Sequence, residues 1–409
     1  MTGRVCICAA MLLAAGASQA LDAPDLHLRL RAGAWSGDRQ LDDRRGASAG
    51  NLWLDAYQPL GPQAALKFEG WAYRESTGNP SFQPWRAREG YLRLDHGDLQ
   101  ARLGWQTFAW GRADRINPTD NLSARDHRTL VGQDEEQRFG SPAAMLAWSL
   151  GPRWRLQALA KRFDASVLPS AGREEALPWA RHPDGRPEWA VRLDRNGDDG
   201  VDGSVSWFRG YDKQRALELT PDGAGLQRRH AGLTALGGDL AVAEGAWTFR
   251  TEAAALRLDG SAPAARGGKQ GSVQWVLGAE RALPASASLN LQWFGRRLRQ
   301  PLADPQGLMP LSAALLRLAA QANGQTARDS QGLSLRYAQR LLNDRLDYEL
   351  VALVGWGDRG RAFRPRLNWQ WTDATRFTFG ADVFRGPPPA TFGVLRPNSL
   401  VFVEASHAL

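Results

Sequence analysis

Apolar and polar side chains alternate along short stretches of this chain, from about residue 26 to its last residue. Residues 289–293 read LNLQW, 346–350 read LDYEL and 377–379 read FTF. A period of two residues is that of a β-strand with one apolar and one polar face. After the N-terminal segment, no stretch approaches the roughly 18 uninterrupted apolar residues of a membrane-spanning helix. The pattern therefore predicts an all-β chain.

The alternation predicts about eighteen strands. Their lengths suit the roughly 9–11 residues that a tilted strand needs to cross a bilayer. The expected limits are 26–35, 51–58, 65–75, 89–97, 98–110, 142–150, 153–162, 188–195, 201–211, 229–239, 245–257, 270–281, 286–298, 331–341, 345–357, 363–372, 375–386 and 398–408.

The connections between these strands alternate in length. Those after even-numbered strands are short and hold Gly, Asn, Asp and Pro, the residues of tight turns: 96–98, 151–152, 196–200, 342–344 and 372–374. Those after odd-numbered strands are mostly long and polar: 36–50, 76–88, 111–141, 163–187, 212–228, 299–330 and 387–397. A soluble β-sandwich would also alternate, but its turns do not sort by length at its two ends. We therefore predict a transmembrane antiparallel up-and-down β-barrel with short periplasmic turns and long external loops.

The first residues have the form of a secretory signal peptide. Arg4 precedes an apolar run from about residue 5 to 17, and Ser18-Gln19-Ala20 is a small-x-small cleavage site. The run is shorter than the ~20 residues of a spanning helix, which disfavours a membrane anchor. We expect residues 1–20 to be the signal peptide and 21–409 to be one barrel domain. Both cysteines, Cys6 and Cys8, lie in the signal segment, so the barrel has no disulfide or thiolate metal site.

Composition adds two expectations. The chain has 17 Trp, and many stand near predicted strand ends, where aromatic girdles of membrane barrels lie: Trp35, Trp53, Trp105, Trp110, Trp154, Trp207 and Trp356. The formal charge is +8, from Arg above all, and a basic lumen favours anions. Nucleic-acid binding is disfavoured, because the Arg residues alternate along strands and do not cluster with exposed aromatics.

If the apolar face meets lipid, the polar face lines the lumen. The charged residues expected there are Arg29, Arg31, Lys67, Glu69, Arg93, Arg102, Arg155, Lys161, Arg192, Arg250, Glu252, Arg296, Arg336 and Glu349. They could form a basic ladder that guides an anionic solute. They could equally pair across neighbouring strands and stiffen the wall.

The longest connection is dense in Asn, Asp, Pro and Arg, and a loop of this length is commonly functional or disordered. We expect it to fold inward and narrow the pore, although an external cap is the alternative. Its candidate constriction residues are Trp110, Arg112, Asp114, Asn117, Asp120, Asn121, Arg125 and Asp126.

This loop also carries a family resemblance. Residues 110–118 read Trp-Gly-x-x-Asp-x-x-Asn-Pro after a Gly-x-x-x-x-x-Trp strand, and this resembles porin-like proteobacterial outer-membrane barrels, in the style of alginate-export channels. Residues 203–211 and 382–409 are similar to them as well. The resemblance implies a porin or exporter in the bacterial outer membrane, inserted by the assembly machinery. The chain departs from the family by ending in Leu409, where an aromatic residue is usual.

Two further segments deserve a prediction. Residues 308–322 have helical periodicity, so they form a helix that plugs the lumen or packs on the outer rim. Residues 194–200 look like the start of a calcium loop but lack its Gly and Glu, so we expect a hairpin turn.

Nothing in the sequence supports catalysis or a cofactor, because the six His residues are scattered without metal-ligand spacing. His127 beside Asp126 and His182 near Asp184 are expected to be solvated loop pairs; a hydrolase at the rim is the minor alternative. We expect an outer-membrane channel, surrounded by lipid, for passive passage of a small anionic solute or an acidic polysaccharide. A loop-plugged barrel that anchors a surface polymer or partner is the other interpretation.

Overall fold

The computed structural model describes residues 23–37, 46–76, 85–129, 132–167, 176–260, 262–263, 266–387 and 390–409. The predicted signal peptide 1–20, with Cys6 and Cys8, lies outside these residues. So do parts of the predicted loops 36–50, 76–88, 111–141, 163–187 and 387–397.

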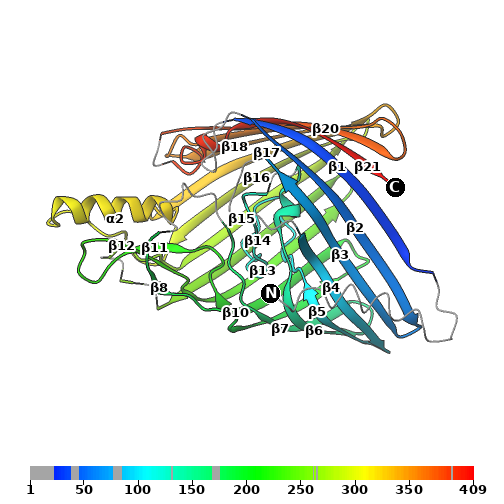
Figure 1. Cartoon of the computed structure of the whole chain (residues 1–409), viewed down its shortest axis with the longest axis horizontal. Helices are drawn as coiled ribbons and strands as arrows, with labels where there is room; N and C mark the ends of the chain where they lie inside the picture. Colours follow the sequence, from blue (N-terminus) through cyan, green and yellow to red (C-terminus); the bar gives the residue numbers. More distant parts are fainter. Residues whose placement is uncertain are drawn as a thin grey trace.

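Eighteen strands form one closed sheet (Figure 1). Each pairs antiparallel with the next one along the chain, and β1 pairs with β21 to close the barrel. The strands are β1 (Asp25–Gly37), β2 (Ala47–Gly61), β3 (Ala64–Glu75), β4 (Trp85–His96), β5 (Leu99–Gln106), β6 (Ser141–Leu150), β7 (Trp154–Arg162), β9 (Pro187–Asn196), β10 (Val201–Tyr211), β13 (Gly232–Glu244), β14 (Trp247–Asp259), β15 (Ser272–Leu283), β16 (Ala287–Leu298), β17 (Asp329–Leu341), β18 (Leu346–Trp356), β19 (Arg361–Gln370), β20 (Thr375–Arg385) and β21 (Leu400–Ala408).

The predicted fold class and all the predicted strands are confirmed. The largest disagreement is the end of β13, predicted at residue 239 but found at Glu244, and β5 ends at Gln106 instead of at the predicted residue 110. The apolar residues after Gln106 do not continue the wall, because the chain leaves the sheet there. The short turns lie together at one end of the barrel, here called the turn end, and the long connections lie at the other, here called the loop end (Figure 1).

The outer surface of the barrel is apolar. Leucines and valines at outward positions are largely exposed, with relative accessibilities of 62% for Leu236, 60% for Val205 and 50% for Leu291. A continuous exposed apolar surface marks an interface with protein or membrane, and in a barrel it is the lipid-facing band. Within the described part of the chain, no helix is long or apolar enough to cross a bilayer.

The expectation of an aromatic girdle is wrong for three tryptophans. Trp154, Trp207 and Trp356 are exposed as expected, but Trp35 and Trp110 are only 4% and 6% accessible. Trp53 packs edge-on against Trp71 at 4.8 Å, and the guanidiniums of Arg31 and Arg88 lie over its ring. Trp35 and Trp53 stand at the same alternation as lumen-facing polar residues of their strands, so they face inward.

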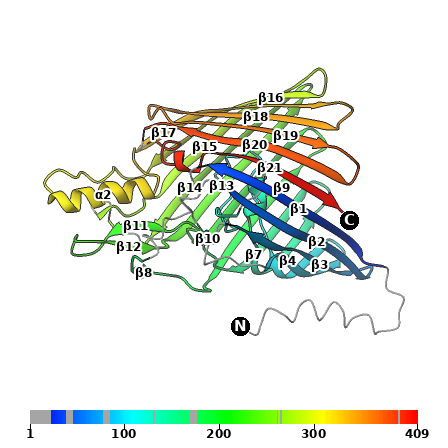
Figure 2. The ribbon, with the colours of Figure 1, turned by 45° about the horizontal axis from the view of Figure 1, so that its top comes forward.

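A small second sheet lies beyond the strands at the loop end (Figure 2). It contains β8 (Trp179–Arg181), β11 (Ala216–Leu219) and β12 (Leu226–Arg229), and the helix α2 (Pro310–Ala322) packs on it through Leu316 and Ala319. Asn323 fastens the end of α2, because its side chain both accepts from Leu217 N and donates to Leu217 O, at 2.8 Å each. The predicted helix is therefore present, and it lies on the rim instead of in the lumen. Two 3₁₀ turns, η2 (Asp134–Gln137) and η4 (Arg396–Asn398), complete the described elements.

Candidate functional site

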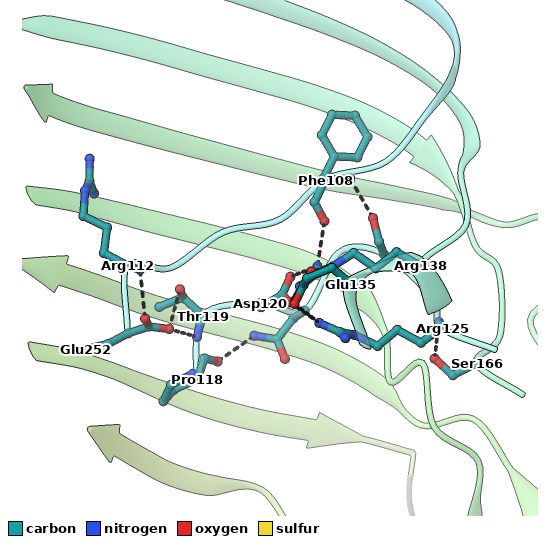
Figure 3. Close-up of polar contacts among 12 residues, drawn as sticks. Phe108, Arg112, Pro118, Thr119, Asp120, Arg125, Glu135, Arg138, Ser166 and Glu252 are labelled. Atoms are coloured by element: carbon teal, nitrogen blue, oxygen red, sulfur yellow. Dashed lines mark hydrogen bonds and ion pairs between the residues drawn. The ribbon is translucent and has the colours of Figure 1, made fainter. Parts of the chain in front are cut away.

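The segment between β5 and β6 runs inside the barrel, and one wall carboxylate holds its first half (Figure 3). Glu252 on β14 is 1% accessible. One carboxylate oxygen accepts hydrogen bonds from the backbone N–H groups of Arg112 and Ala113, both at 3.2 Å. The other accepts from Thr119 N at 2.7 Å and Thr119 Oγ1 at 2.8 Å. A carboxylate that accepts four hydrogen bonds is fully satisfied, so Glu252 fixes the course of residues 112–119.

Gly111 makes this approach possible. Its φ of +103° lies in the region that favours glycine. A Cβ at this position would lie 2.6 Å from the Glu252 carboxylate. The Trp-Gly pair of the sequence motif therefore has a structural reason: the backbone must pass directly over a buried carboxylate.

Charged side chains of the same segment reach other strands. The Arg112 guanidinium bonds to Asp239 on β13, lies 3.3 Å from Asp194 on β9, and donates to Asn196 at 3.1 Å. Arg115 pairs with Glu349 on β18. These contacts place the segment against the inner wall formed by strands β9 to β18.

Asp114 continues this set of contacts from inside the loop. Arg336 on β17 lies 3.7 Å from Asp114 and 2.7 Å from Glu349. Burial raises the pKa of Asp114, and the charge of Arg336 offsets this only in part. Asp114 and the wall carboxylate Glu349 thus share the single cation Arg336.

The second half of the segment attaches to the opposite wall. Glu136 accepts two hydrogen bonds from Arg31 on β1, at 2.5 and 2.6 Å. Asp126 accepts from Arg86 on β4 at 2.7 Å. Burial alone would raise the pKa of Asp126, but the hydrogen bond from Arg128 and the charge of Arg86 outweigh it and lower the pKa. Since β1 and β4 lie across the barrel from β14, the segment spans the lumen.

Contacts within the segment keep it compact. Arg138 bonds to Asp120 at 2.9 Å and to the carbonyl of Phe108 at 3.3 Å (Figure 3). Arg125 also lies 3.5 Å from Asp120, and its backbone N–H donates to Ser166 Oγ at 3.0 Å. The side-chain amide of Asn121 donates to Pro118 O at 2.9 Å, which closes the chain on itself three residues back. Of the other predicted loop residues, Asn117 is half-buried and its Oδ1 has no partner among the described residues.

An apolar patch on the inner wall supports this segment. Trp110 and Leu122 pack on a cluster that includes Met145, Leu159, Phe208 and Leu233 from four strands. The expectation of a polar inner face throughout is therefore wrong here. Inner faces of such barrels are usually polar because they meet water. Here the segment covers these side chains and keeps the water of the lumen from them, so apolar residues are favourable.

Most of the charged residues predicted to line the lumen have an opposite charge beside them. The pairs are Arg31–Glu136, Lys67–Asp55, Glu69–Arg88, Arg93–Asp95, Lys161–Glu188, Arg192–Asp194, Arg250–Glu280 and Arg336–Glu349. Of the two interpretations of these charges, pairing accounts for this larger group; most pairs join neighbouring strands or the loop, and Arg93–Asp95 and Arg192–Asp194 each lie within one strand. Lys161 is fully buried and also donates to Leu122 O at 3.0 Å, so it supports the segment instead of facing water.

Three arginines of the predicted set differ from the rest. Within the described chain, Arg102, Arg155 and Arg296 form no ion pair with a carboxylate. Arg102 lies over the Tyr91 ring at 5.2 Å, Arg155 donates to Gln100 at 3.1 Å, and Arg296 donates to Gly324 O at 2.7 Å. The Nε atom of each is buried without a partner in the described structure. Arg29 is exposed towards the turn end of β1.

A ring cluster joins two external loops at the rim. His230 stacks on Trp179 at 5.2 Å and meets His182 and Phe163 edge-on at 5.2 and 5.1 Å. Its Nδ1 lies 2.8 Å from Asp212 O. Burial lowers the pKa of His230 to about 4, from a usual value of 6.5. Between pH 6.5 and about 4, the ring thus stays neutral in the folded chain, whereas in the unfolded chain it takes up a proton.

This shift predicts a pH window for the rim. The unfolded chain binds a proton at His230 as pH falls from about 6.5 to 4, and the folded chain does not, so the cluster loses stability over that window. Histidine NMR titration of the refolded protein in micelles should give a midpoint near 4 for one ring, and the His230→Gln variant should lose that signal. A midpoint near 6.5 for His230 would show that the ring is solvated.

Sites of other kinds find little support. Among the described residues, no group of three or more His, Cys, Asp or Glu could hold a metal ion. His182 pairs with Asp184 at 2.6 Å, while Asp126 is engaged by Arg86 and Arg128. The calcium-like stretch is the turn between β9 and β10, as predicted, closed by a pair between Arg195 and Asp199 at 2.5 Å.

A closed 18-stranded barrel with a long loop folded into its lumen defines a porin-type fold. Comparison with solved structures agrees. The chain is similar to OccAB1 of Acinetobacter baumannii, with a TM-score of 0.63 and 11% identity over 96% of this chain and 98% of that one. It is also similar to two Pseudomonas aeruginosa proteins: OccK5 (OpdH), with a TM-score of 0.58 and 11% identity over 95% and 98%, and OccK10 (OpdN), with 0.58 and 14% over 94% and 99%.

At these identities the likeness concerns the fold alone. It supports the resemblance to porin-like outer-membrane barrels. The comparisons do not show a similarity to alginate-export channels, so that part of the resemblance stays a prediction. A scan of protein-family models finds no match, and a search of curated proteins finds none either.

Proposed function

We propose that this protein is a passive channel of the bacterial outer membrane for small hydrophilic solutes, with a preference for anions. The observation that carries the proposal is the loop of residues 107–140, anchored on opposite walls of an 18-stranded barrel. A barrel of this size has room for an aqueous channel, and such a loop narrows the channel. The predicted constriction residues belong to this loop, and the proposal assigns them that role.

The preference for anions rests on Arg102, Arg155 and Arg296. The paired charges of the wall largely cancel one another at the distance of a passing ion. Arginines without a carboxylate beside them keep a positive field, and their planar donors suit carboxylate and phosphate groups. A basic lumen of this kind raises the local concentration of anions.

Solute size follows from the position of the loop. The loop is anchored on β1 and β4 at one side and on β14 and β18 at the other. It therefore lies across the path that a polymer would take through the lumen. This favours a small anionic solute over the acidic polysaccharide that the family resemblance also allows. The same dense anchoring supports a second candidate, a plugged barrel that anchors a partner at the surface.

Liposome swelling separates these candidates. Proteoliposomes with the refolded barrel would be tested with three solutes of similar size: gluconate, glucose and glucosamine. We expect swelling to be fastest with gluconate and slowest with glucosamine. Equal rates for the three would contradict the anion preference, and no swelling with any of them would favour the plugged barrel.

A further inference from the structure

A row of arginines crosses the outside of the barrel at its loop end. Arg209 on β10 pairs with Thr234 on β13, which pairs with Arg257 on β14. The next strands continue the row, since Leu256 is opposite Ser272 and Arg299 N donates to Gly271 O at 2.9 Å. Arg209, Thr234, Arg257, Gly271 and Arg299 therefore lie side by side. We call Arg209, Arg257 and Arg299 the outer arginine row.

The row faces outward and borders the apolar band. Glu252 and Ala254 of β14 are buried inside, so Arg257 belongs to the opposite alternation, and its side chain is 70% exposed. Two residues closer to the turn end, the same strands present Trp207, Leu236 and Val273, all exposed. A positive row directly above an apolar surface lies where lipid headgroups begin.

These guanidiniums have little else to bind. Arg257 pairs with Asp259 at 3.1 Å, but both side chains are at least half exposed, and such surface pairs are weak. Within the described chain, Arg209 and Arg299 form no ion pair. A polar cavity of about 470 Å³ opens at the row, lined by Arg257, Arg299 and the neighbouring Lys269 among others. Lys269 is held there by Asp212 at 2.6 Å.

Gly271 lies at the centre of the row, where the neighbouring strand and the stem of Arg299 approach its backbone closely. It carries no side chain between Arg257 and Arg299, and a Cβ there would come within 3.3 Å of Arg299 Cδ and 2.5 Å of Leu256 O. Strands lie about 4.8 Å apart, so successive arginines of the row are about 10 Å apart. Two guanidiniums at this spacing can approach one anionic group from either side.

We propose that the outer arginine row binds the phosphate groups of the glycolipid that forms the outer leaflet of the bacterial outer membrane. Guanidiniums bind phosphate with paired hydrogen bonds, and basic surface clusters of membrane proteins recognise anionic headgroups. The acyl chains of such a lipid would cover Trp207, Leu236 and Val273 below the row. The inference rests on the proposed outer-membrane location, but it does not depend on channel activity.

The barrel offers a matched control at its other end. Arg281 on β15 also faces outward, and its guanidinium lies over the Trp247 ring at 5.1 Å, near the turns that join β13 to β14 and β15 to β16. It has the same side chain and an aromatic neighbour, but it lies at the turn end, which faces the opposite leaflet.

The test measures lipid binding to the refolded full chain in micelles by native mass spectrometry. The probes are bisphosphorylated lipid A, the same lipid without phosphates, and inorganic phosphate as competitor. We expect the triple variant Arg209→Gln, Arg257→Gln, Arg299→Gln to bind the phosphorylated lipid at least about tenfold more weakly. Arg281→Gln should bind it as the unmodified protein does.

Three results would overturn the proposal: unchanged binding in the triple variant, equal binding of the lipid without phosphates, or displacement of the lipid by millimolar inorganic phosphate. Heat-modifiable migration on gels verifies that each variant forms the barrel. Swelling rates of the triple variant should equal those of the unmodified protein, so failure of this inference and failure of the channel proposal are distinguishable.

Discussion

Replacing Glu252 with alanine should at least double the single-channel conductance and leave the barrel folded. The substitution removes the four hydrogen bonds that Glu252 accepts from residues 112–119 and leaves three backbone N–H groups without their acceptor. Unsatisfied buried donors are costly, so the segment should leave the wall and seek water. The strands of the barrel do not depend on Glu252 for their pairing, and heat-modifiable migration should be unchanged.

Glu280→Ala is the matched control for this effect. Glu280 is also a wall carboxylate, on the neighbouring strand β15, and it pairs with Arg250 at 2.5 Å instead of with the loop. Both variants remove one negative charge from the lumen, but only Glu252→Ala releases the loop. If the two variants raise the conductance equally, the effect is one of charge, and the anchoring role of Glu252 is wrong.

The second large effect concerns ion selectivity. We expect the double variant Arg102→Gln, Arg155→Gln to lower the anion-over-cation permeability ratio by at least half. These arginines form no ion pair with a carboxylate in the described chain, so their charge acts on the passing ion. Reversal potentials under a salt gradient measure the ratio, and the effect should weaken as the salt concentration rises.

The control for selectivity removes a pair of opposite charges. Arg250→Gln with Glu280→Gln eliminates one cation and its carboxylate together, and the wall keeps its net charge. We expect the permeability ratio to stay as it is. A larger change in this control than in the Arg102 and Arg155 variant would place selectivity in the paired charges and contradict the account.

The strands could be predicted from the sequence because each is a local pattern. Alternation of period two needs only the residues of one strand, and the turn residues mark its ends, as in β10, where the predicted and observed limits agree at residues 201 and 211. The charged lumen residues followed from the same alternation. The fold supports the resemblance of residues 110–118 to porin-like barrels, but the resemblance did not predict any of the contacts of this segment.

The contacts that make the site are not local. Glu252 and Thr119 are separated by 133 positions, and Arg115 and Glu349 by 234. Alternation assigned Glu252 and Glu349 to the lumen, but it could not show that a loop would bind them. Alternation could not distinguish Arg102 from Arg250 either. Arg250 has a carboxylate partner on another strand that neutralises its charge, and the pattern of one strand does not show such a partner.

The inward tryptophans show where a composition rule fails. The rule that aromatic residues collect in a lipid girdle predicts this position for Trp35 and Trp110. The parity of Trp35 with Arg31 on the same strand was a signal against that assignment. The sequence holds no such signal for the apolar patch of Met145, Leu159, Phe208 and Leu233. The patch is apolar because a distant loop covers it, and the strands alone do not show that loop.

Single-channel recording of the refolded, unmodified protein in a planar bilayer tests the central claim most directly. A barrel with an anchored but incomplete constriction should give discrete conductance steps, and the reversal potential under a salt gradient should show anion preference. A silent barrel would contradict the channel proposal, and steps with cation preference would contradict the role of Arg102, Arg155 and Arg296.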